Sequence, residues 1–256
     1  QALRYNIIQQ LGWDNTPVDG KSGVVQFAPN ASIKDYPEID LFGYMKNTSK
    51  SSNKKENEGE QGKKEDKGGA TTRSAVVRLS NAIALEPYNS DMDFLNNMGL
   101  AKRKNLENGI AQSEIQRTTY AYTVTIDLDR VGIDCNEEIS NKEKADRICK
   151  FLDILMFLYR DIKGRRENLS PIFVIGGRYE RKNPYFDGRL KLKGSSLNVN
   201  CLKKIIEGDK DIKENTKIGY IDGMFSNNEE IIKTLNPITV TEFFKALKKE
   251  VEDYYA

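Results

Sequence analysis

The sequence predicts one α+β domain whose elements follow the ferredoxin-like βαββαβ order, with the first strand missing from this chain. Three runs rich in β-branched and aromatic residues, 73–85, 118–132 and 170–177, are expected to form strands. Two segments with apolar residues at helical spacing, 2–11 and 141–164, are expected to form helices. Their order along the chain is the ferredoxin-like order from its second element onward. Since the first strand of that fold is central, we expect the chain to lack a central strand. An α+β domain of another order is the alternative.

Each expected helix combines an apolar stripe with a glycine at its end. In the first helix the apolar positions are 3, 7, 8 and 11, and Gly12 follows them. In the second helix the apolar positions 148, 151, 152, 155, 158 and 159 form one wide stripe, and Gly164 marks the expected end.

Two segments are expected to interrupt the domain. Residues 46–72 contain no apolar residue except Ala70 and their charges nearly cancel, which is typical of a disordered low-complexity insert. Residues 86–117 lie between two expected strands and are predicted to be an inserted loop region. A short strand is also expected within 23–27, in the loop-rich region after the first helix.

The composition excludes a wholly basic protein, because 40 Lys and Arg stand against 38 Asp and Glu and the net charge is only +2. A site for an anion must therefore come from local segregation of charge. Residues 160–193 show such segregation, with ten Lys or Arg residues against four acids. A protein that holds a polyanion on one face is one interpretation, and a generally solvated charged surface is the other.

The sequence contains no histidine, which removes the commonest general base and the commonest metal ligand. The three cysteines, Cys135, Cys149 and Cys201, form no CxxC pair. We therefore expect reduced thiols of a cytoplasmic protein, and neither a disulfide framework nor a zinc site. The longest apolar run, 151–159, is too short to span a membrane, and no membrane partner is expected.

A glycine pair at the end of the last expected strand opens the first candidate binding site. Gly176 and Gly177 would let the backbone approach a ligand closely, because neither residue has a Cβ atom. The loop that follows carries cations that suit phosphate and a ring that suits a base: Arg178, Tyr179, Arg181 and Lys182. A tight turn followed by a basic hairpin explains the same residues without a ligand.

A run of cations in the inserted loop region is the second candidate. Lys102, Arg103 and Lys104 are consecutive, which suits contacts to a nucleic-acid backbone and equally suits a solvated loop. Three arginines at the expected strands are predicted to face the same groove: Arg73, Arg78 and Arg117. One of them, Arg78, also suits a cross-strand ion pair.

No catalytic residue is expected. Asp127 and Asp129 are two apart in an expected strand and would share a face, where paired carboxylates can bind Mg²⁺. No further acid cluster accompanies them, and acids near the end of a strand usually solvate it. Asp40 is interpreted in the same way, so we expect no metal, no cofactor and no enzymatic activity.

Five strings of this sequence together resemble a known family. They are QALRYNI at 1–7, DLFGYM at 40–45, RSAVVRLSNAIALEPYNSDMDFLNNMG at 73–99, EIQRTTYAYTVTIDLD at 114–129 and GGRY at 176–179. In combination they resemble the CRISPR-associated backbone subunit of type I (Cascade) effector complexes, in the DevR-type, type I-B branch of Cas family seven. The resemblance covers most of residues 1–194 and is weak after about residue 195.

The resemblance implies an RRM-like palm with inserted fingers and a protruding thumb. Copies of such a subunit stack along one CRISPR RNA and hold its backbone, while the bases stay free to pair with target DNA. Other Cascade subunits are implied as further partners. The positions that the resemblance implicates in RNA binding are Gln1, Arg4, Asn6, Arg73, Arg117, Gly176, Gly177 and Arg178. Backbone subunits of type III complexes cut RNA with a loop aspartate, which no position here matches, so a non-catalytic scaffold is implied.

Two other functions stay open. An RRM-like endoribonuclease that processes CRISPR repeat RNA fits the expected fold, with Tyr or Lys acting in place of His. A transcriptional regulator that binds duplex DNA fits the name of the DevR group, but no helix-turn-helix pattern is evident in the sequence.

Overall fold

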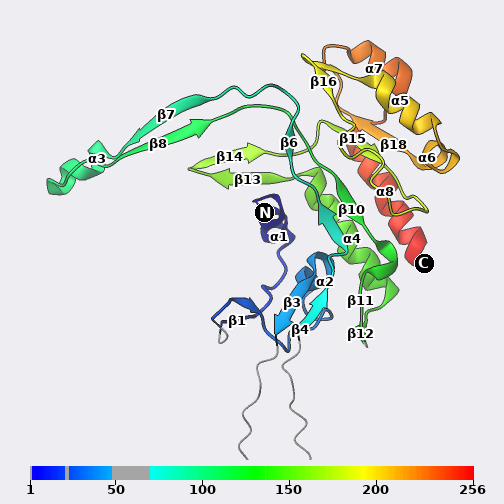
Figure 1. Ribbon diagram of the computed structural model, residues 1–256, viewed down its shortest axis with the longest axis horizontal. Helices are drawn as coiled ribbons and strands as arrows, with labels where there is room; N and C mark the ends of the chain where they lie inside the picture. Colours follow the sequence, from blue (N-terminus) through cyan, green and yellow to red (C-terminus); the bar gives the residue numbers. More distant parts are fainter. Residues whose placement is uncertain (1, 21–22, 48–69, 136) are drawn as a thin grey trace, which may run out of the picture.

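The computed structural model shows a mixed α+β protein built around two long helices. It describes residues 2–20, 23–47, 70–135 and 137–256. The two helices, α4 (Asn141–Met156) and α8 (Val240–Tyr255), pack side by side (Figure 1). The α+β class predicted from the sequence is therefore confirmed.

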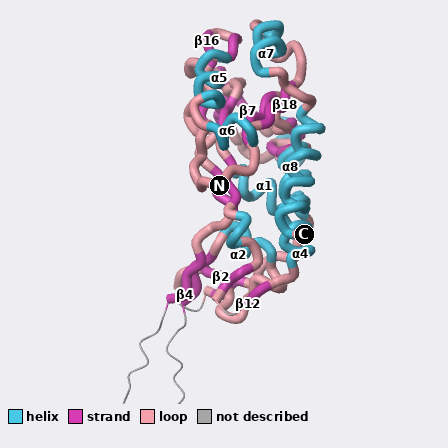
Figure 2. The backbone as a smooth tube through the Cα atoms, turned by 90° about the vertical axis from the view of Figure 1, so that its right-hand side faces the viewer, coloured by secondary structure: helices cyan, strands magenta, loops and turns pink. Residues whose placement is uncertain are grey.

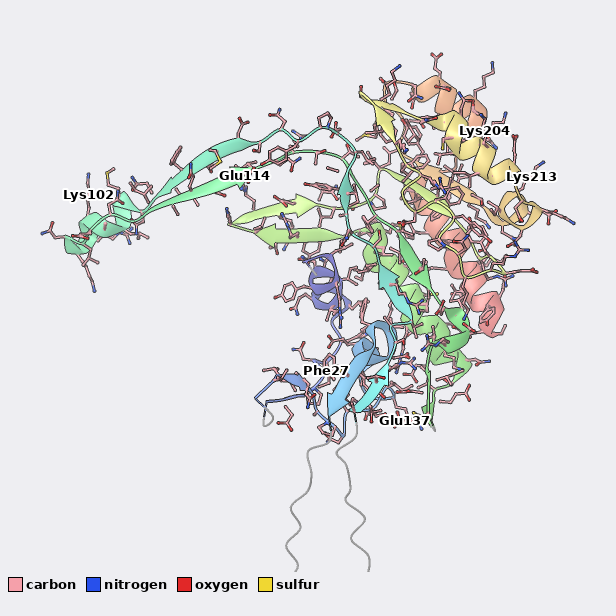
Figure 3. All side chains as sticks on the ribbon, in the orientation of Figure 1. Phe27, Lys102, Glu114, Glu137, Lys204 and Lys213 are labelled. Carbon is pink, nitrogen blue, oxygen red and sulfur yellow. The ribbon has the colours of Figure 1, made fainter. Side chains whose placement is uncertain are left out.

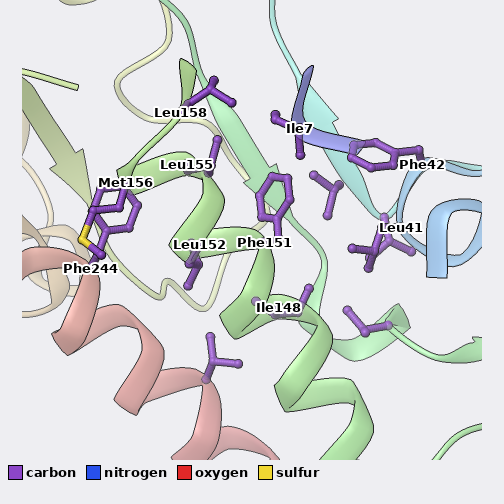
Figure 4. Packing of buried hydrophobic residues seen from close by; sticks show 14 of the residues in the cluster. Ile7, Leu41, Phe42, Ile148, Phe151, Leu152, Leu155, Met156, Leu158 and Phe244 are labelled. Atoms are coloured by element: carbon purple, nitrogen blue, oxygen red, sulfur yellow. The ribbon is translucent and has the colours of Figure 1, made fainter. Parts of the chain in front are cut away.

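The main core forms around α4, which packs against α8 and against α1 (Ala2–Leu11). Its fully buried side chains include Ile7, Ile148 and Phe151 (Figure 4). Removing such side chains from water is the dominant favourable contribution to folding. The first helix thus lies where the sequence predicts it, and its apolar stripe faces the core.

The strands pair two at a time and form no continuous sheet among the described residues. β5 (Val77–Leu79) pairs with β10 (Val124–Ile126), and β15 (Phe173–Gly176) pairs with β18 (Lys217–Tyr220), both antiparallel. Within the described part of the chain, β10 and β15 each have one hydrogen-bonded neighbour. In the expected ferredoxin-like order these two strands would flank the first strand, so the RRM-like palm stays a prediction.

Two short ribbons and a helix form the N-terminal part of the molecule. β1 (Val18–Asp19) pairs with β2 (Gln26–Phe27), α2 (Pro37–Phe42) follows, and β3 (Tyr44–Asn47) pairs with β4 (Ala70–Arg73). β2 lies inside the strand expected within 23–27. The insert expected at 46–72 is too long at both ends, because its outermost residues belong to the β3–β4 ladder. Residues 48–69, the rest of that expected insert, lie outside the described residues.

Residues 86–117, which we call the arm, leave the body as a β-hairpin (Figure 1). β7 (Asp91–Asn96) pairs with β8 (Ile110–Ile115), α3 (Met98–Ala101) and η1 (Lys102–Lys104) form the tip, and β6 (Ile83–Ala84) pairs with β9 (Tyr120–Ala121) at the root. The expected loop region is thus largely a hairpin. Its strands mix apolar residues with Asp, Asn, Gln and Glu, and apart from Ser113 they are exposed, so no buried apolar face distinguishes them from a loop.

Two expected strands are each divided into shorter elements. The run at 118–132 contains β9 and β10, and then the short helical turn η2 (Leu128–Arg130). The run at 73–85 contains the last residue of β4, then β5 and β6. After η2, β11 (Ile133–Asp134) pairs with β12 (Glu137–Glu138). The strand expected at 170–177 contains β15, as predicted.

The helix expected over 141–164 ends at Met156, and a hairpin of β13 (Tyr159–Ile162) and β14 (Arg165–Asn168) follows. Lys163 and Gly164 form its turn with φ values of 49° and 74°. This is the left-handed conformation that a tight two-residue hairpin turn requires. Gly164 therefore turns a hairpin and does not end a helix. The expected apolar stripe was too long because it continued into Leu158, which is buried, and Tyr159, which is half-buried, and neither residue is helical.

The C-terminal residues add a second, smaller core for which the sequence predicted no elements. Its elements are β16 (Leu192–Lys193), β17 (Ser196–Leu197), α5 (Val199–Glu207), α6 (Lys210–Asn215) and α7 (Asn228–Leu235). Phe186, Leu202 and Ile231 are buried in this core together with Tyr220 of β18. Figure 2 shows this lobe at the opposite end of the molecule from β4 and β12.

Candidate nucleic-acid interface

A buried cluster of charged side chains contains two arginines, which are therefore not available to a ligand at the surface. Asp40, with 0% of its surface exposed, accepts from Arg73 Nη2 at 2.7 Å and from Arg147 Nη1 at 2.9 Å. Its Oδ1 also accepts from the Gly132 amide at 2.9 Å. The interpretation of Asp40 as a solvated lone acid was therefore wrong, because the carboxylate is the centre of an ion cluster.

Arg73 is a structural residue in this arrangement. Only 7% of its surface is exposed, and its guanidinium also donates to the carbonyls of Arg130, at 2.9 Å, and Ile133. Those donors are occupied within the fold and face away from solvent. We therefore leave Arg73 out of the interface that its position at a strand predicted.

The candidates on α1 are held against the N-terminal part of the molecule. The Arg4 guanidinium lies 3.6 Å from Glu38 Oε1 and 4.8 Å from the centroid of the Phe42 ring. Arg4 is nevertheless partly exposed, so an anion can approach it from the solvent side. Asn6 is half-buried, and Gln1 lies outside the described residues.

The glycine pair serves internal packing. A Cβ atom on Gly177 would lie 1.9 Å from the backbone oxygen of Asn215, so only glycine fits beside α6. A Cβ atom on Gly176 would meet open space. The close approach that the sequence indicated thus occurs, but its partner is the chain's own backbone.

The ring at the start of the following loop also faces inward. The Tyr179 hydroxyl is 2.8 Å from Thr216 Oγ1, and its ring meets Tyr185 edge to face with centroids 5.2 Å apart. Burial raises the pKa of Tyr179 to about 12, so the phenol is neutral at physiological pH. Tyr179 packs against the second core and is poorly placed for stacking on a base.

Three candidate cations at the start of this loop each have a partner in the protein. The Arg178 guanidinium lies 5.9 Å from the ring centroid of Tyr254 on α8. Arg181 is 3.9 Å from Asp209, and Lys182 is 2.7 Å from Asp129. All three side chains are exposed, and surface ion pairs of this kind are weak, so they remain able to bind phosphate.

The two candidate acids do not share a strand face. Asp127 lies just after β10 and is buried, with Arg78 at 3.0 Å and Arg130 at 3.8 Å from its carboxylate. Asp129 lies in η2 and pairs with Lys182. The chain turns helical between the two acids, which separates their side chains. Arg78 is thus the ion-pair partner that one of the two interpretations expected.

The arm carries candidate cations that form no ion pair with the rest of the described protein. Lys102, Arg103, Lys104 and Arg117 are exposed, and none of them forms an ion pair with another described residue. Figure 3 shows Lys102 at the end of the arm, away from the body. Because no internal partner must be displaced, these cations are ready to bind an anion.

The tip of the β13–β14 hairpin supplies two cations that the sequence analysis did not single out. Lys163 and Arg165 flank Gly164 and are exposed, whereas Arg160 and Arg166 pair with acids in their own hairpin. The signal was the string KGRR at 163–166, a turn glycine among cations. The turn was missed because the preceding helix was expected to continue to residue 164.

The structure divides the sequence-predicted residues into two groups. The arm, the β13–β14 hairpin and α1 lie to one side of α4 in Figure 1, whereas Arg178 lies against α8 on the other side. The group beside α1 contains the cations of the arm and of the hairpin tip. We take this first group as the candidate interface.

A comparison with protein families matches a segment that contains the arm and also the loop that begins at Arg178. Residues 11–190 match the model of a family described as CRISPR-associated negative auto-regulator DevR/Csa2. The chain belongs to this family. The match includes the arm and the β13–β14 hairpin, and it stops before most of the second core. The resemblance seen in the sequence, to the DevR-type branch of Cas family seven, is therefore confirmed.

No curated protein matches the chain. Among the described residues, no helix is both long and apolar enough to cross a bilayer. The described residues also contain no cluster of three or more Cys, Asp and Glu side chains placed to hold a metal ion.

We predict that replacing Asp40 with Asn lowers the free energy of unfolding by about 3–5 kcal/mol, because it removes the fully buried counter-charge that two buried guanidinium groups share and leaves them only the peripheral carboxylates of Asp134 and Glu143. Asp14 is exposed, so Asp14→Asn is the matched control and should change stability by less than about 0.5 kcal/mol. Urea unfolding followed by circular dichroism measures both changes. Equal unfolding midpoints for the two variants would contradict the central role of this cluster.

Proposed function

We propose that this protein is a non-catalytic RNA-binding backbone subunit of a type I (Cascade) interference complex, which multimerises along CRISPR RNA and presents the guide to target DNA. The observation that carries the proposal is the arm, a two-stranded hairpin with exposed apolar faces and a cluster of cations at its tip that form no ion pairs with other described residues. Membership of a CRISPR-associated family supports RNA as the polyanion. The proposed partners are CRISPR RNA, target DNA paired to the guide, copies of this protein and other Cascade subunits, in the cytoplasm.

The apolar surface of the arm supports multimerisation. An isolated two-stranded hairpin is marginally stable in water, because it has no third strand or helix against which to bury its side chains. The arm nevertheless exposes many large apolar side chains: Met92, Phe94, Leu95, Met98, Leu100, Leu106, Ile110 and Ile115. A neighbouring copy in a filament would cover such an element, which is the role that the family resemblance implies for a protruding digit.

The charge of the arm tip supports contact with an RNA backbone. Lys102, Arg103 and Lys104 lie on one turn of η1 and carry no carboxylate partner among the described residues. A guide changes from one CRISPR spacer to the next, so its holder must contact phosphate and sugar and leave base edges free. Clustered cations without a base-reading pocket suit that requirement.

The remaining candidates contribute at other points of the same proposal. We propose that Arg4, Asn6 and Arg117 contact RNA beside α1 and at the arm root, together with Arg165. We propose that Arg178, Arg181 and Lys182, on the other side of α4, contact RNA held by a neighbouring copy. The RRM-like palm belongs to this proposal and is supported by the β5–β10 and β15–β18 pairs.

The test of the proposed function is purification of the protein after co-expression with a CRISPR array and without added nuclease. We expect high-mass species with a raised ratio of absorbance at 260 nm to that at 280 nm, carrying protected RNA. Mass photometry and sequencing of the bound RNA measure both. A monomer free of nucleic acid would contradict the proposal, and short trimmed repeats would favour the endoribonuclease.

The second candidate function is a transcriptional regulator, which the words "negative auto-regulator" in the family description favour. It predicts tighter binding to duplex DNA than to single-stranded RNA. Competition between the two nucleic acids at one salt concentration distinguishes the candidates.

We predict that replacing Lys102, Arg103 and Lys104 together with Ala weakens RNA binding whatever the RNA sequence. If each cation contacts one phosphate of a single strand, the slope of log K against log salt concentration should fall by about 2. Fluorescence anisotropy across a salt series measures this slope.

The matched control is the triple Ala variant of three exposed cations on the C-terminal lobe, Lys204, Lys213 and Lys233, of which the first two are labelled in Figure 3. It removes the same charge from a region outside the family match. An identical loss of slope in the two variants would show that net charge, and not the arm tip, governs binding.

A further inference from the structure

We propose that the protein fixes the direction of its own arm with two contacts, a clamp at the root centred on Glu86 and a brace at the middle made by Lys163. Both residues are thereby positioning residues. Neither was a candidate in the sequence analysis, and the second resembles an RNA-binding cation by its exposure alone.

The clamp closes the point at which the arm leaves the body. Glu86 Oε2 accepts from Thr118 Oγ1 at 2.8 Å and from the Thr119 amide at 2.7 Å. The Leu85 amide donates to the Thr119 carbonyl at 2.9 Å, directly beyond the β6–β9 pair. The strand ladder then stops and resumes only at the pair of Asp91 and Ile115. Glu86 therefore ties the two chains together where backbone pairing gives way.

The clamp is a charge-assisted contact. The Thr119 amide, and then the Thr118 hydroxyl, lower the pKa of Glu86, so its carboxylate is ionised at neutral pH. Hydrogen bonds to an ionised acceptor are roughly twice as strong as those between neutral groups. One side chain can thus hold the two chains together at the point where the regular pairing of β6 and β9 stops.

The brace reaches the arm from a separate hairpin. Lys163, at the turn between β13 and β14, donates from Nζ to Ser113 Oγ of β8. Ser113 is only 8% exposed, whereas the other residues of β8 are exposed. Its ladder partner is Asp93, and Asp91 lies on the same face of β7, so this face offers negative charge to the lysine ammonium.

The two contacts lie at different positions along the arm. Together they restrict rotation of the arm about its root more than either contact would alone. The root clamp closes the gap in the ladder, and the brace rests on a tight turn with little freedom of its own. An arm that is directed before it meets a partner avoids the ordering cost that a free hairpin would incur on binding. The readouts below need no RNA and no second copy, so they are independent of the proposed function.

The root clamp is tested by limited trypsin digestion of the purified protein, because Arg117 immediately precedes Thr118. Glu86→Ala and Thr118→Val should each raise the initial rate of cleavage after Arg117 by about tenfold, since cleavage requires local opening. Thr118→Ser keeps the hydroxyl and is the matched control, with a rate close to that of the unaltered protein. Mass spectrometry of the early fragments measures these rates.

Cleavage at the tip, after 102–104, supplies the internal control and should stay unchanged in every variant. An unchanged rate after Arg117 in both Glu86→Ala and Thr118→Val would overturn the clamp. A parallel rise after the buried Arg147 would mean loss of the whole fold and would equally contradict a local role.

The brace is tested by the distance between two spin labels, one on the arm at Glu107→Cys and one on α4 at Lys142→Cys, both exposed positions. The native cysteines Cys135, Cys149 and Cys201 are replaced with Ser in this background. Lys163→Met and Ser113→Ala should each broaden the distance distribution measured by pulsed electron resonance.

Arg165→Met is the matched control, because it removes an exposed cation from the same turn and has no ion pair with another described residue. Its distribution should equal that of the labelled protein without further change. The brace is rejected if Lys163→Met leaves the distribution as narrow as Arg165→Met does.

Discussion

Asp40 places a carboxylate at a position with no exposed surface, between guanidinium groups that come from β4 and α4. Removing a charge from water costs several kcal/mol, which is recovered only when counter-charges and hydrogen bonds surround it closely. Arg73 and Arg147 supply the charges, and the Gly132 amide supplies a further donor. This one requirement brings together α2, β4, α4 and the turn before β11. The N-terminal ribbons and the main core are joined through it.

Surface ion pairs engage several of the other cations. The basic run at 160–193 is less basic in three dimensions than in sequence, because Arg160 and Arg166 pair within their hairpin and Lys182 pairs with Asp129. The arm tip has no such partners among the described residues. Among the cations that the sequence singled out, those of the arm tip are therefore less engaged than Arg178, Arg181 and Lys182.

The arm itself shows how an element without a core of its own keeps a direction. Both faces of its hairpin are exposed, so packing contributes little to its position. Polar contacts at Glu86 and Lys163 take over that task. Apolar side chains on the same hairpin stay exposed and available to a partner.

Local sequence determined the elements whose pattern is complete within one segment. The apolar stripe of α1, the start of α4 and the strand β15 depend on spacing and propensity, and they lie where the sequence predicts them. The five quoted strings also identified the family, because their combination is recognisable in the sequence without knowledge of the fold.

Tertiary structure decided the roles of individual side chains. The spacing of residues cannot show that Asp40 and Arg73, which are 33 residues apart, form an ion pair. It also cannot show that the close neighbour of Gly177 is the Asn215 carbonyl and not a ligand. It also cannot separate a buried helix turn from a buried hairpin start, which is why α4 ends earlier than expected. Charge pairing, close backbone approach and burial all depend on which distant segments meet. The sequence by itself therefore determined the family, α1 and the start of α4, and only the fold decided which cations are free of ion pairs with other described residues.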